Sequence, residues 1–202
     1  MRLFGMGKDK QETGKTKPDK LAALVKALPV LEQAFKLRPV GKAGLCLRAH
    51  SGDKKDKTLP LTAMDLEARA DEVLKFGVVA ANTDYKAVED SYKFLWLILQ
   101  NDDFANLVSV TSKVAASLRE KGYADNLVVG MFPFLKDDKD VYWVYGFGRD
   151  RFYPFVPGDE EPRRNNQLEV DMAEKLEKDK DFPLEQHLEF WRALWGAPFS
   201  IM

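Results

Sequence analysis

The stretch that most constrains the fold is SYKFLWLILQ, residues 91–100. Every residue from Phe94 to Leu99 is apolar, so a strand formed here presents apolar side chains on both of its faces. Such a strand needs cover on both faces, which places it in the middle of a sheet. We therefore expect a fold organised around a central strand at residues 91–100.

The segment that follows, residues 104–121, has the period of an amphipathic helix. Its apolar stripe consists of Phe104, Leu107, Val108, Thr111, Val114, Ala115 and Leu118. Asp102 or Asp103 is placed to cap the start of the helix, and Gly122 is placed to end it.

Earlier in the chain, the spacing of apolar residues predicts two more helices and another strand. One helix begins at Asp19, which can cap it, and Pro29 breaks or kinks it; a short turn follows at residues 30–36. A strand is expected at residues 43–49 and a helix at residues 64–76.

Three β segments follow the helix of residues 104–121, at residues 126–135, 141–148 and 151–156. Short polar turns join them, which favours antiparallel pairing. Pro154 has no N–H and confines the last of them to a sheet edge or a strand end.

Two helices are expected to finish the chain. Asn166 can cap the first, with Glu169 completing a capping box. The second carries Leu184, Leu188, Trp191 and Trp195 on one stripe, and Gly196 stops it. Helices flanking a largely antiparallel sheet of about four to five strands give an α+β fold. We assign it to residues 19–202 as a single domain, behind a flexible N-terminal tail at residues 1–18.

Composition excludes several classes of protein. The 202 residues carry a net charge of −1, so no overall field favours nucleic acid. The single cysteine, Cys46, excludes an internal disulfide. The absence of a long apolar run or a signal-peptide pattern leads us to expect a cytoplasmic protein. The tail is basic and carries Leu3, Phe4 and Met6, so contact with the inner face of the membrane is the alternative to a solvated tail.

The segment RFYPFVPGDEEPRRNNQLE combines arginines with aromatic residues more densely than the rest of the chain. One interpretation is a strand that ends and a helix that begins. RNA binding would use the rings for stacking, but nearby acidic residues offset the arginines. A protein-binding edge fits the composition better. Its candidate residues are Arg149, Arg151, Phe152, Tyr153, Phe155, Arg163 and Arg164.

No residue pattern predicts catalysis or a cofactor. Gly14-Lys15-Thr16 resembles the end of a phosphate-binding loop, but Asp9 stands where that motif needs glycine. His50 and His187 have no ligand spacing, so we expect no metal. Cys46 lies in an apolar strand, where a buried thiol is more common than a nucleophile.

Several blocks of the chain resemble one protein family. FYPFVP at 152–157, RRNNQLEVDMAEKL at 163–176 and FWRALWGAP at 190–198 together resemble the PspA-associated protein PspAB family, and GKAGLCLRA at 41–49 and SYKFLWLIL at 91–99 are similar to its earlier blocks. The resemblance implies a link to phage-shock-type envelope stress, with a PspA-like coiled coil or an HtpX-like membrane protease as partner. It implies no catalytic residues. The order of elements is also similar to the secretion-chaperone-like fold, an analogy that says little about function.

These observations lead to one function hypothesis and two alternatives. The leading hypothesis is a non-enzymatic adaptor or regulator of a membrane-stress response that acts by protein binding. The alternatives are a small-molecule-binding enzyme with an unrecognised site and a structural domain that dimerises through exposed aromatic residues. Partner identity and oligomeric state do not follow from the sequence.

Overall fold

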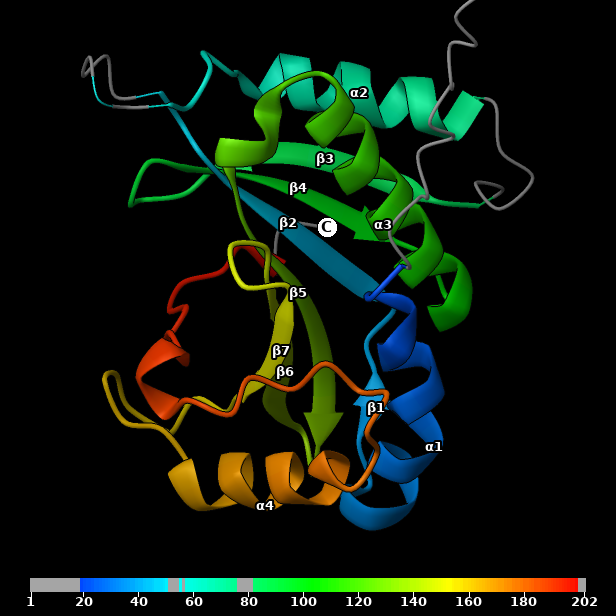
Figure 1. Ribbon diagram of the computed structural model, residues 1–202, viewed down its shortest axis with the longest axis vertical. Coiled ribbons are helices and arrows are strands. Elements are labelled where there is room, and N and C mark those ends of the chain that lie inside the picture. The colour runs from blue at the N-terminus through cyan, green and yellow to red at the C-terminus, as the bar shows by residue number, and fades with distance from the viewer. Residues whose placement is uncertain (1–18, 51–54, 56, 76–81, 200–202) are drawn as a thin grey trace, which may run out of the picture.

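The computed structural model describes residues 19–50, 55, 57–75 and 82–199. In this part of the chain, four α-helices accompany one sheet of seven strands (Figure 1). The helices are α1 (Ala22–Phe35), α2 (Ala63–Lys75), α3 (Phe104–Glu120) and α4 (Asn166–Glu177). The strands are β1 (Arg38–Pro39), β2 (Lys42–Arg48), β3 (Asp84–Glu89), β4 (Phe94–Gln100), β5 (Leu127–Lys136), β6 (Lys139–Gly146) and β7 (Arg151–Phe155).

The sheet pairs antiparallel throughout, in the order β3-β4-β2-β5-β6-β7, while β1 pairs with β5 beside this path. The predicted α+β class and antiparallel sheet are confirmed. The sheet is larger than the four to five strands predicted, because β1 and β3 were missed. β3 has the sequence DYKAVE and alternates charged with less polar residues, so it lacks the apolar run that marks β4. β4 lies between β3 and β2, as expected of a central strand.

One face of the sheet is covered by helices, and we call it the helical face. Because paired residues share a face, Leu45 of β2 and Leu97 of β4 point the same way, and both are fully buried. α3 anchors this face through Phe104, whose ring meets those of Phe132 and Phe134 edge-on at 6.4 and 5.4 Å. Figure 1 shows α1 and α3 in front of the sheet, α2 across one end and α4 across the other.

The helix start at α3 confirms the expected cap. Asp103 is the N-cap, and its side chain accepts a hydrogen bond from Asn106 N at 3.0 Å. Gly122 follows the helix with φ of 93°, a left-handed conformation that favours glycine. Of the break or kink predicted at Pro29, the break is wrong, since α1 continues to Phe35. Pro29 lies on the exposed side of α1, where water can satisfy the carbonyl left unpaired, while Leu24 and Leu31 are buried.

The capping box predicted for α4 is also wrong. The N-cap is Asn165 and not Asn166, and the Glu169 side chain does not bond to the start of the helix. Asn165 is the N-cap and accepts from Leu168 N at 3.1 Å. Glu169 is buried and turns inward, where it accepts hydrogen bonds from Val156 N at 2.7 Å and from Arg164 Nε at 3.0 Å. A buried backbone N–H at the end of β7 therefore takes the carboxylate that the sequence pattern assigned to the helix start.

The last predicted helix is absent. Residues 185–199, which we call the C-terminal strap, contain no α-helix but a 3₁₀ turn at Leu188–Phe190. The chain instead pairs with the edge of β7, where Phe152 N donates to Pro183 O and Glu185 N donates to Phe152 O, both at 2.7 Å. These edge hydrogen bonds replace the ones that a helix would supply.

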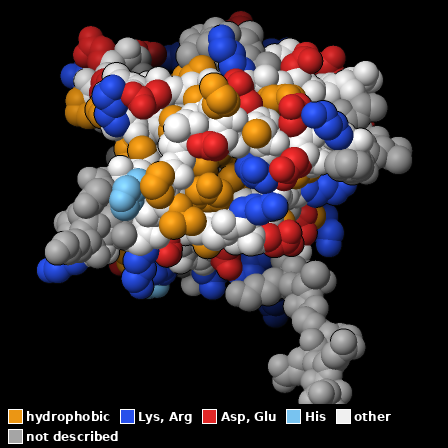
Figure 2. All heavy atoms as spheres, turned by 90° about the horizontal axis from the view of Figure 1, so that it is seen from above, with side chains coloured by type: hydrophobic (Ala, Val, Ile, Leu, Met, Phe, Trp, Pro, Cys, Tyr) orange, Lys and Arg blue, Asp and Glu red, His pale blue; other side chains and the backbone are white. Residues whose placement is uncertain are grey.

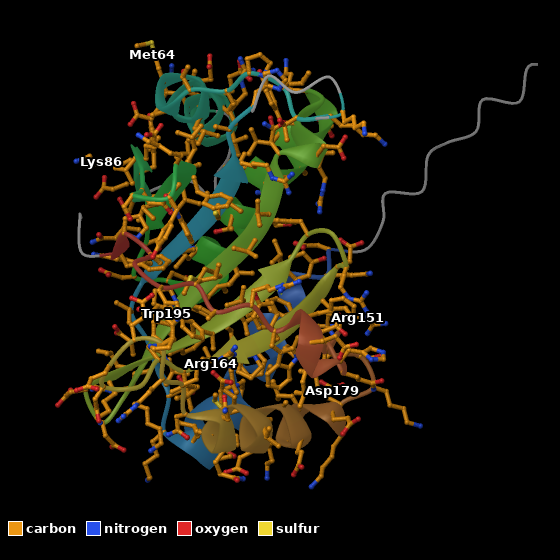
Figure 3. The ribbon with its side chains drawn as sticks, turned by 90° about the vertical axis from the view of Figure 1, so that its left-hand side faces the viewer. Met64, Lys86, Arg151, Arg164, Asp179 and Trp195 are labelled. Carbon is orange, nitrogen blue, oxygen red and sulfur yellow. The ribbon has the colours of Figure 1, made fainter. Side chains whose placement is uncertain are left out.

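The strap crosses the sheet face opposite the helical face (Figure 3). Trp191 stacks on Tyr153 with ring centroids 6.4 Å apart, and Trp195 meets Phe155 edge-on at 5.0 Å. Phe199 meets Trp96 of β4 at 6.1 Å. The extended strap thus covers this face of the sheet as the helices cover the other face. Its aromatic side chains pack against those of the sheet.

Candidate functional site

The structure places the predicted aromatic residues in the core. Phe152, Tyr153 and Phe155 are 0%, 3% and 1% exposed. Phe152 stacks on Phe182 at 5.2 Å, and the other two rings lie under the strap. Tyr153 and Phe155 hold the strap to the sheet, and none of the three rings offers surface to another molecule.

Three of the four predicted arginines bind the same strap or the chain leading to it. Arg149 donates to the Glu185 carboxylate and lies 3.8 Å over the Phe190 ring. Arg151 donates to Leu184 O at 3.1 Å.

Arg164 makes the third such contact. It donates to Trp191 O at 3.0 Å, pairs with Glu169 and lies 5.1 Å over the Phe155 ring. Arg163 differs: its side chain is 79% exposed and reaches Glu160 at 4.0 Å. The structure thus brings the candidate set together as an attachment for the strap, with Arg163 at the surface.

A basic hollow of about 560 Å³ lies beside the β5–β6 turn and the loop that precedes α4. Its lysines are paired with acidic neighbours, Lys136 with Asp137 and Lys139 with Asp159, each at 2.8 Å. The charges are largely matched within the protein, so this hollow does not stand out as a site for an anionic ligand.

A second hollow, which we call the aromatic groove, lies between the β3–β4 turn and the strap. It measures about 310 Å³ and is lined by Cys46, Asp90, Tyr92, Phe94, Trp96, Val128, Ala193, Leu194 and Trp195. Phe94 and Trp96 are two residues apart in β4 and therefore lie on the same face, and β2 contributes Cys46 beside Trp96.

The wall that the strap contributes to the aromatic groove is set by a turn at Gly196, whose φ is 68°. A Cβ added there would lie 4.0 Å from Cε2 of Tyr92, so the strap and the β3–β4 turn approach each other at this rim. Tyr92 is 61% exposed, and Trp195 is half-buried and labelled in Figure 3. The groove therefore offers aromatic surface to solvent.

Asp90 holds the turn that forms the other wall. Its Oδ1 accepts hydrogen bonds from Tyr92 N at 2.8 Å and from Phe94 N at 2.9 Å. Its Oδ2 accepts from Trp96 Nε1 at 2.8 Å. The carboxylate is half-buried and fixed in place by three uncharged donors.

Cys46, at the floor of the groove, is 2% exposed. Burial, with a smaller effect from the Asp90 charge, raises the pKa of its thiol far above the usual range. The raised pKa disfavours the thiolate form, and the predicted burial of Cys46 is confirmed.

The histidines lie apart. His50 contacts Thr58, with Nδ1 and Oγ1 3.4 Å apart, and exposed His187 lies 3.7 Å from Glu189. Within the described residues, no three His, Cys, Asp or Glu side chains gather as metal ligands would.

The groove could not be assembled from sequence patterns alone. The strand 91–100 was predicted, and Trp195 was placed on an apolar stripe, but nothing brought Trp195 to Trp96. The available signal was the alternation of Tyr92, Phe94 and Trp96 directly after Asp90, which places aromatic rings and a carboxylate at one strand end. Only the extended course of the strap completes the site.

Figure 2 shows a second group of hydrophobic side chains, surrounded by charged ones, on the end of the molecule that carries α2. Met64 lies at this end and is 78% exposed (Figure 3). Met64 is exposed, apolar and outside the lining of the groove, which makes it a control position for the groove.

The fold and the groove together define an α+β protein with a strapped sheet and an aromatic surface hollow. The chain belongs to the PspAB family, PspA associated protein B, whose family model matches residues 1–199. No curated protein and no solved structure matches the chain, so the likeness to the secretion-chaperone-like fold stays a prediction. In the part of the chain that the structure describes, no helix has the length and apolar character needed to cross a membrane.

Proposed function

We propose that the protein is a non-enzymatic adaptor or regulator in a PspA-type, phage-shock membrane-stress response, and that it acts by binding a protein partner at the aromatic groove. Family membership supports the association with PspA-type systems. The observation that carries the binding site is the exposed aromatic lining of the groove.

Aromatic residues suit this role because they supply large contact areas with few rotatable bonds, and they dominate the binding energy of protein interfaces. In this proposal the partner is a PspA-like coiled coil. The protein is cytoplasmic and reaches the inner face of the membrane through that partner, with the basic N-terminal residues as a further contact.

The direct test measures binding between the purified protein and the PspA-like protein of the same cell by isothermal titration calorimetry. Tyr92→Ala removes an exposed groove ring and is expected to weaken binding about tenfold or more, as loss of an interface anchor does. Met64→Ala is the matched control, since it removes an exposed apolar side chain at the end that carries α2, and should leave the affinity unchanged.

Absence of binding by the wild-type protein would contradict a PspA-like partner. The same titration with the HtpX-like membrane protease in detergent then tests the second partner that the family resemblance implies. Equal losses for Tyr92→Ala and Met64→Ala would contradict the groove as the binding site.

A small-molecule site is a second candidate for the same groove, favoured by its volume of about 310 Å³, at the low end of typical ligand pockets. A thermal-shift screen with metabolites separates the two. A compound that stabilises the wild type but not Tyr92→Ala would favour this candidate over a protein partner.

A further inference from the structure

We propose that the aromatic groove is a receptor for an arginine side chain carried by the partner protein. The inference names the chemistry of the partner at the site described above, and so rests on the proposed function. It depends on a charge mismatch in the groove: the Asp90 carboxylate is negative, and no positively charged side chain of the described residues pairs with it.

The mismatch concerns Asp90. All three donors to its carboxylate are uncharged, two backbone N–H groups and the Trp96 indole. Among the described residues no ion pair involves Asp90, and the neighbouring Lys93 pairs with Glu89 at 2.7 Å. The groove therefore contains an ordered negative charge with no cation opposite it.

A neutral apolar occupant would make this mismatch worse. It would remove water from the carboxylate and leave the charge unpaired, which is costly. A cation in the same place would lose water but gain the carboxylate as a partner. When an occupant covers the groove, the Asp90 carboxylate therefore favours one that is positively charged.

The rings around Asp90 favour the same charge. Tyr92, Phe94, Trp96 and Trp195 line the groove with aromatic surface, and the faces of such rings attract cations. Arginine suits this combination better than lysine, because its planar guanidinium stacks on rings. One of its N–H groups can donate to Asp90 Oδ2, which accepts only the Trp96 indole in the structure. Val128 and Leu194 supply apolar surface for the methylene stem.

The shape of the site favours a side chain over a small free cation. Tyr92 at the rim is 61% exposed, so the rings do not close around an occupant as they would around a quaternary ammonium ion. A chain passing over the open rim can insert one residue and continue on either side. The occupant is therefore an arginine held within a peptide segment.

Two synthetic peptides test the charge requirement without any PspA-type protein. One is acetyl-Leu-Arg-Leu-amide and the other replaces arginine by citrulline, which has the same shape without the charge. Binding is followed by the indole N–H signals of Trp96 and Trp195 in ¹H–¹⁵N spectra. We expect the arginine peptide to bind about tenfold more tightly, as a cation over rings with a carboxylate partner implies.

Variants locate the effect. Asp90→Asn should reduce the preference for arginine to less than about twofold, whereas Asp84→Asn, which removes a carboxylate at the opposite end of β3, should leave it at about tenfold. Melting temperatures are measured alongside, since Asp90 also holds its turn. If Asp90→Asn fails to fold, Tyr92→Ala decides instead, because that exposed ring makes no side-chain hydrogen bond in the structure, and its loss should weaken the arginine peptide several-fold.

Three results would overturn the inference: equal binding of the arginine and citrulline peptides, equal effects of the Asp90 and Asp84 changes, or tighter binding of choline than of the arginine peptide. A peptide preference without binding to the PspA-like protein would refute the proposed partner but keep the arginine site. Binding to the PspA-like protein without a preference for the arginine peptide would refute the arginine site but keep the proposed partner.

Discussion

At the scale of single residues, Gly44 of β2 shows how tightly the strap packs on the sheet. A Cβ at this position would lie 3.0 Å from Phe199 Cζ and 3.0 Å from Trp96 Cε3, closer than carbon atoms pack. We expect Gly44→Ala to lower the free energy of unfolding by about 1–3 kcal/mol, the usual cost of overpacking. Urea denaturation measures this change.

Gly148 provides the matched control for that change. A Cβ there meets nothing within 4 Å, so Gly148→Ala should leave the urea midpoint almost unaltered. Equal midpoints for the two variants would contradict the close packing of Phe199 and Trp96 on Gly44.

Two buried carboxylates, Glu169 of α4 and Glu185 of the strap, have pKa values shifted in opposite directions. Burial raises the pKa of Glu169, and the hydrogen bonds from Val156 N and Arg164 offset this only in part. Burial also acts to raise the pKa of Glu185, but the hydrogen bond from Arg149, with smaller contributions, lowers it overall. The two groups should therefore affect stability oppositely as pH changes.

The signs follow from proton linkage. Glu169 stabilises the fold fully below its unfolded pKa of about 4.3, and this contribution disappears as pH rises through the folded pKa. Glu185 stabilises the fold above the unfolded pKa and loses this contribution as pH falls through the folded pKa. Relative to Glu169→Gln, the wild type should lose stability as pH rises above about 4.3. Relative to Glu185→Gln, it should lose stability below about pH 4. Denaturant titrations at each pH give both differences, and slopes of the same sign would refute the assignment.

At the scale of elements, the sequence predicted segments whose own pattern determines their structure. α3 was found because periodicity and capping agree within one segment, and β4 was found because its apolar run is continuous. The prediction of the last helix was wrong because the apolar spacing from Leu184 to Trp195 also suits an extended chain. In that chain the aromatic rings pack one after another on the sheet. What decides between the two is the free edge of β7, which accepts Glu185 N and donates to Pro183 O. That edge lies over thirty residues away in sequence, and no local pattern contains it.

The course of the strap changes what is expected of its two tryptophans. Trp191 is 8% exposed, stacks on Tyr153 and donates its indole N–H to Glu185 O at 2.9 Å. We expect Trp191→Ala to cost about 3–5 kcal/mol of stability, as for other buried aromatic residues. Trp195 is only half-buried, so Trp195→Ala should cost less stability and lose affinity for the partner. Urea denaturation and partner titration of both variants separate these effects, and unchanged midpoints in both would show that the strap is not part of the core.

At the scale of the whole molecule, the predicted site and the observed groove differ for a physical reason. The arginine and aromatic density at residues 149–164 is real, but it serves attachment of the strap: Phe155 packs under Trp195, and Arg164 holds Trp191 O. Composition alone does not separate an aromatic residue that binds a partner from one that binds its own chain. The groove joins the β3–β4 turn to a segment about one hundred residues later in sequence, so it depends on the complete fold.

The largest change that the fold should tolerate is removal of the N-terminal residues. The N-cap of α1 is Leu21, which has no side-chain cap, so the predicted cap at Asp19 is wrong. The core formed by the described residues begins at Leu21, Leu21 N donates to Asp19 Oδ1 at 3.0 Å, and Lys20 pairs with Asp150 at 3.5 Å. A chain that starts at residue 18 keeps all of these contacts. We therefore expect deletion of residues 1–17 to leave the melting temperature nearly unchanged in differential scanning calorimetry. The predicted flexible tail, residues 1–18, lies outside the described residues, and a contact between it and the partner stays a prediction. Partner titration of the same deletion tests that contact, and a loss of many degrees in melting temperature would instead mean that Leu3, Phe4 or Met6 contributes to the core.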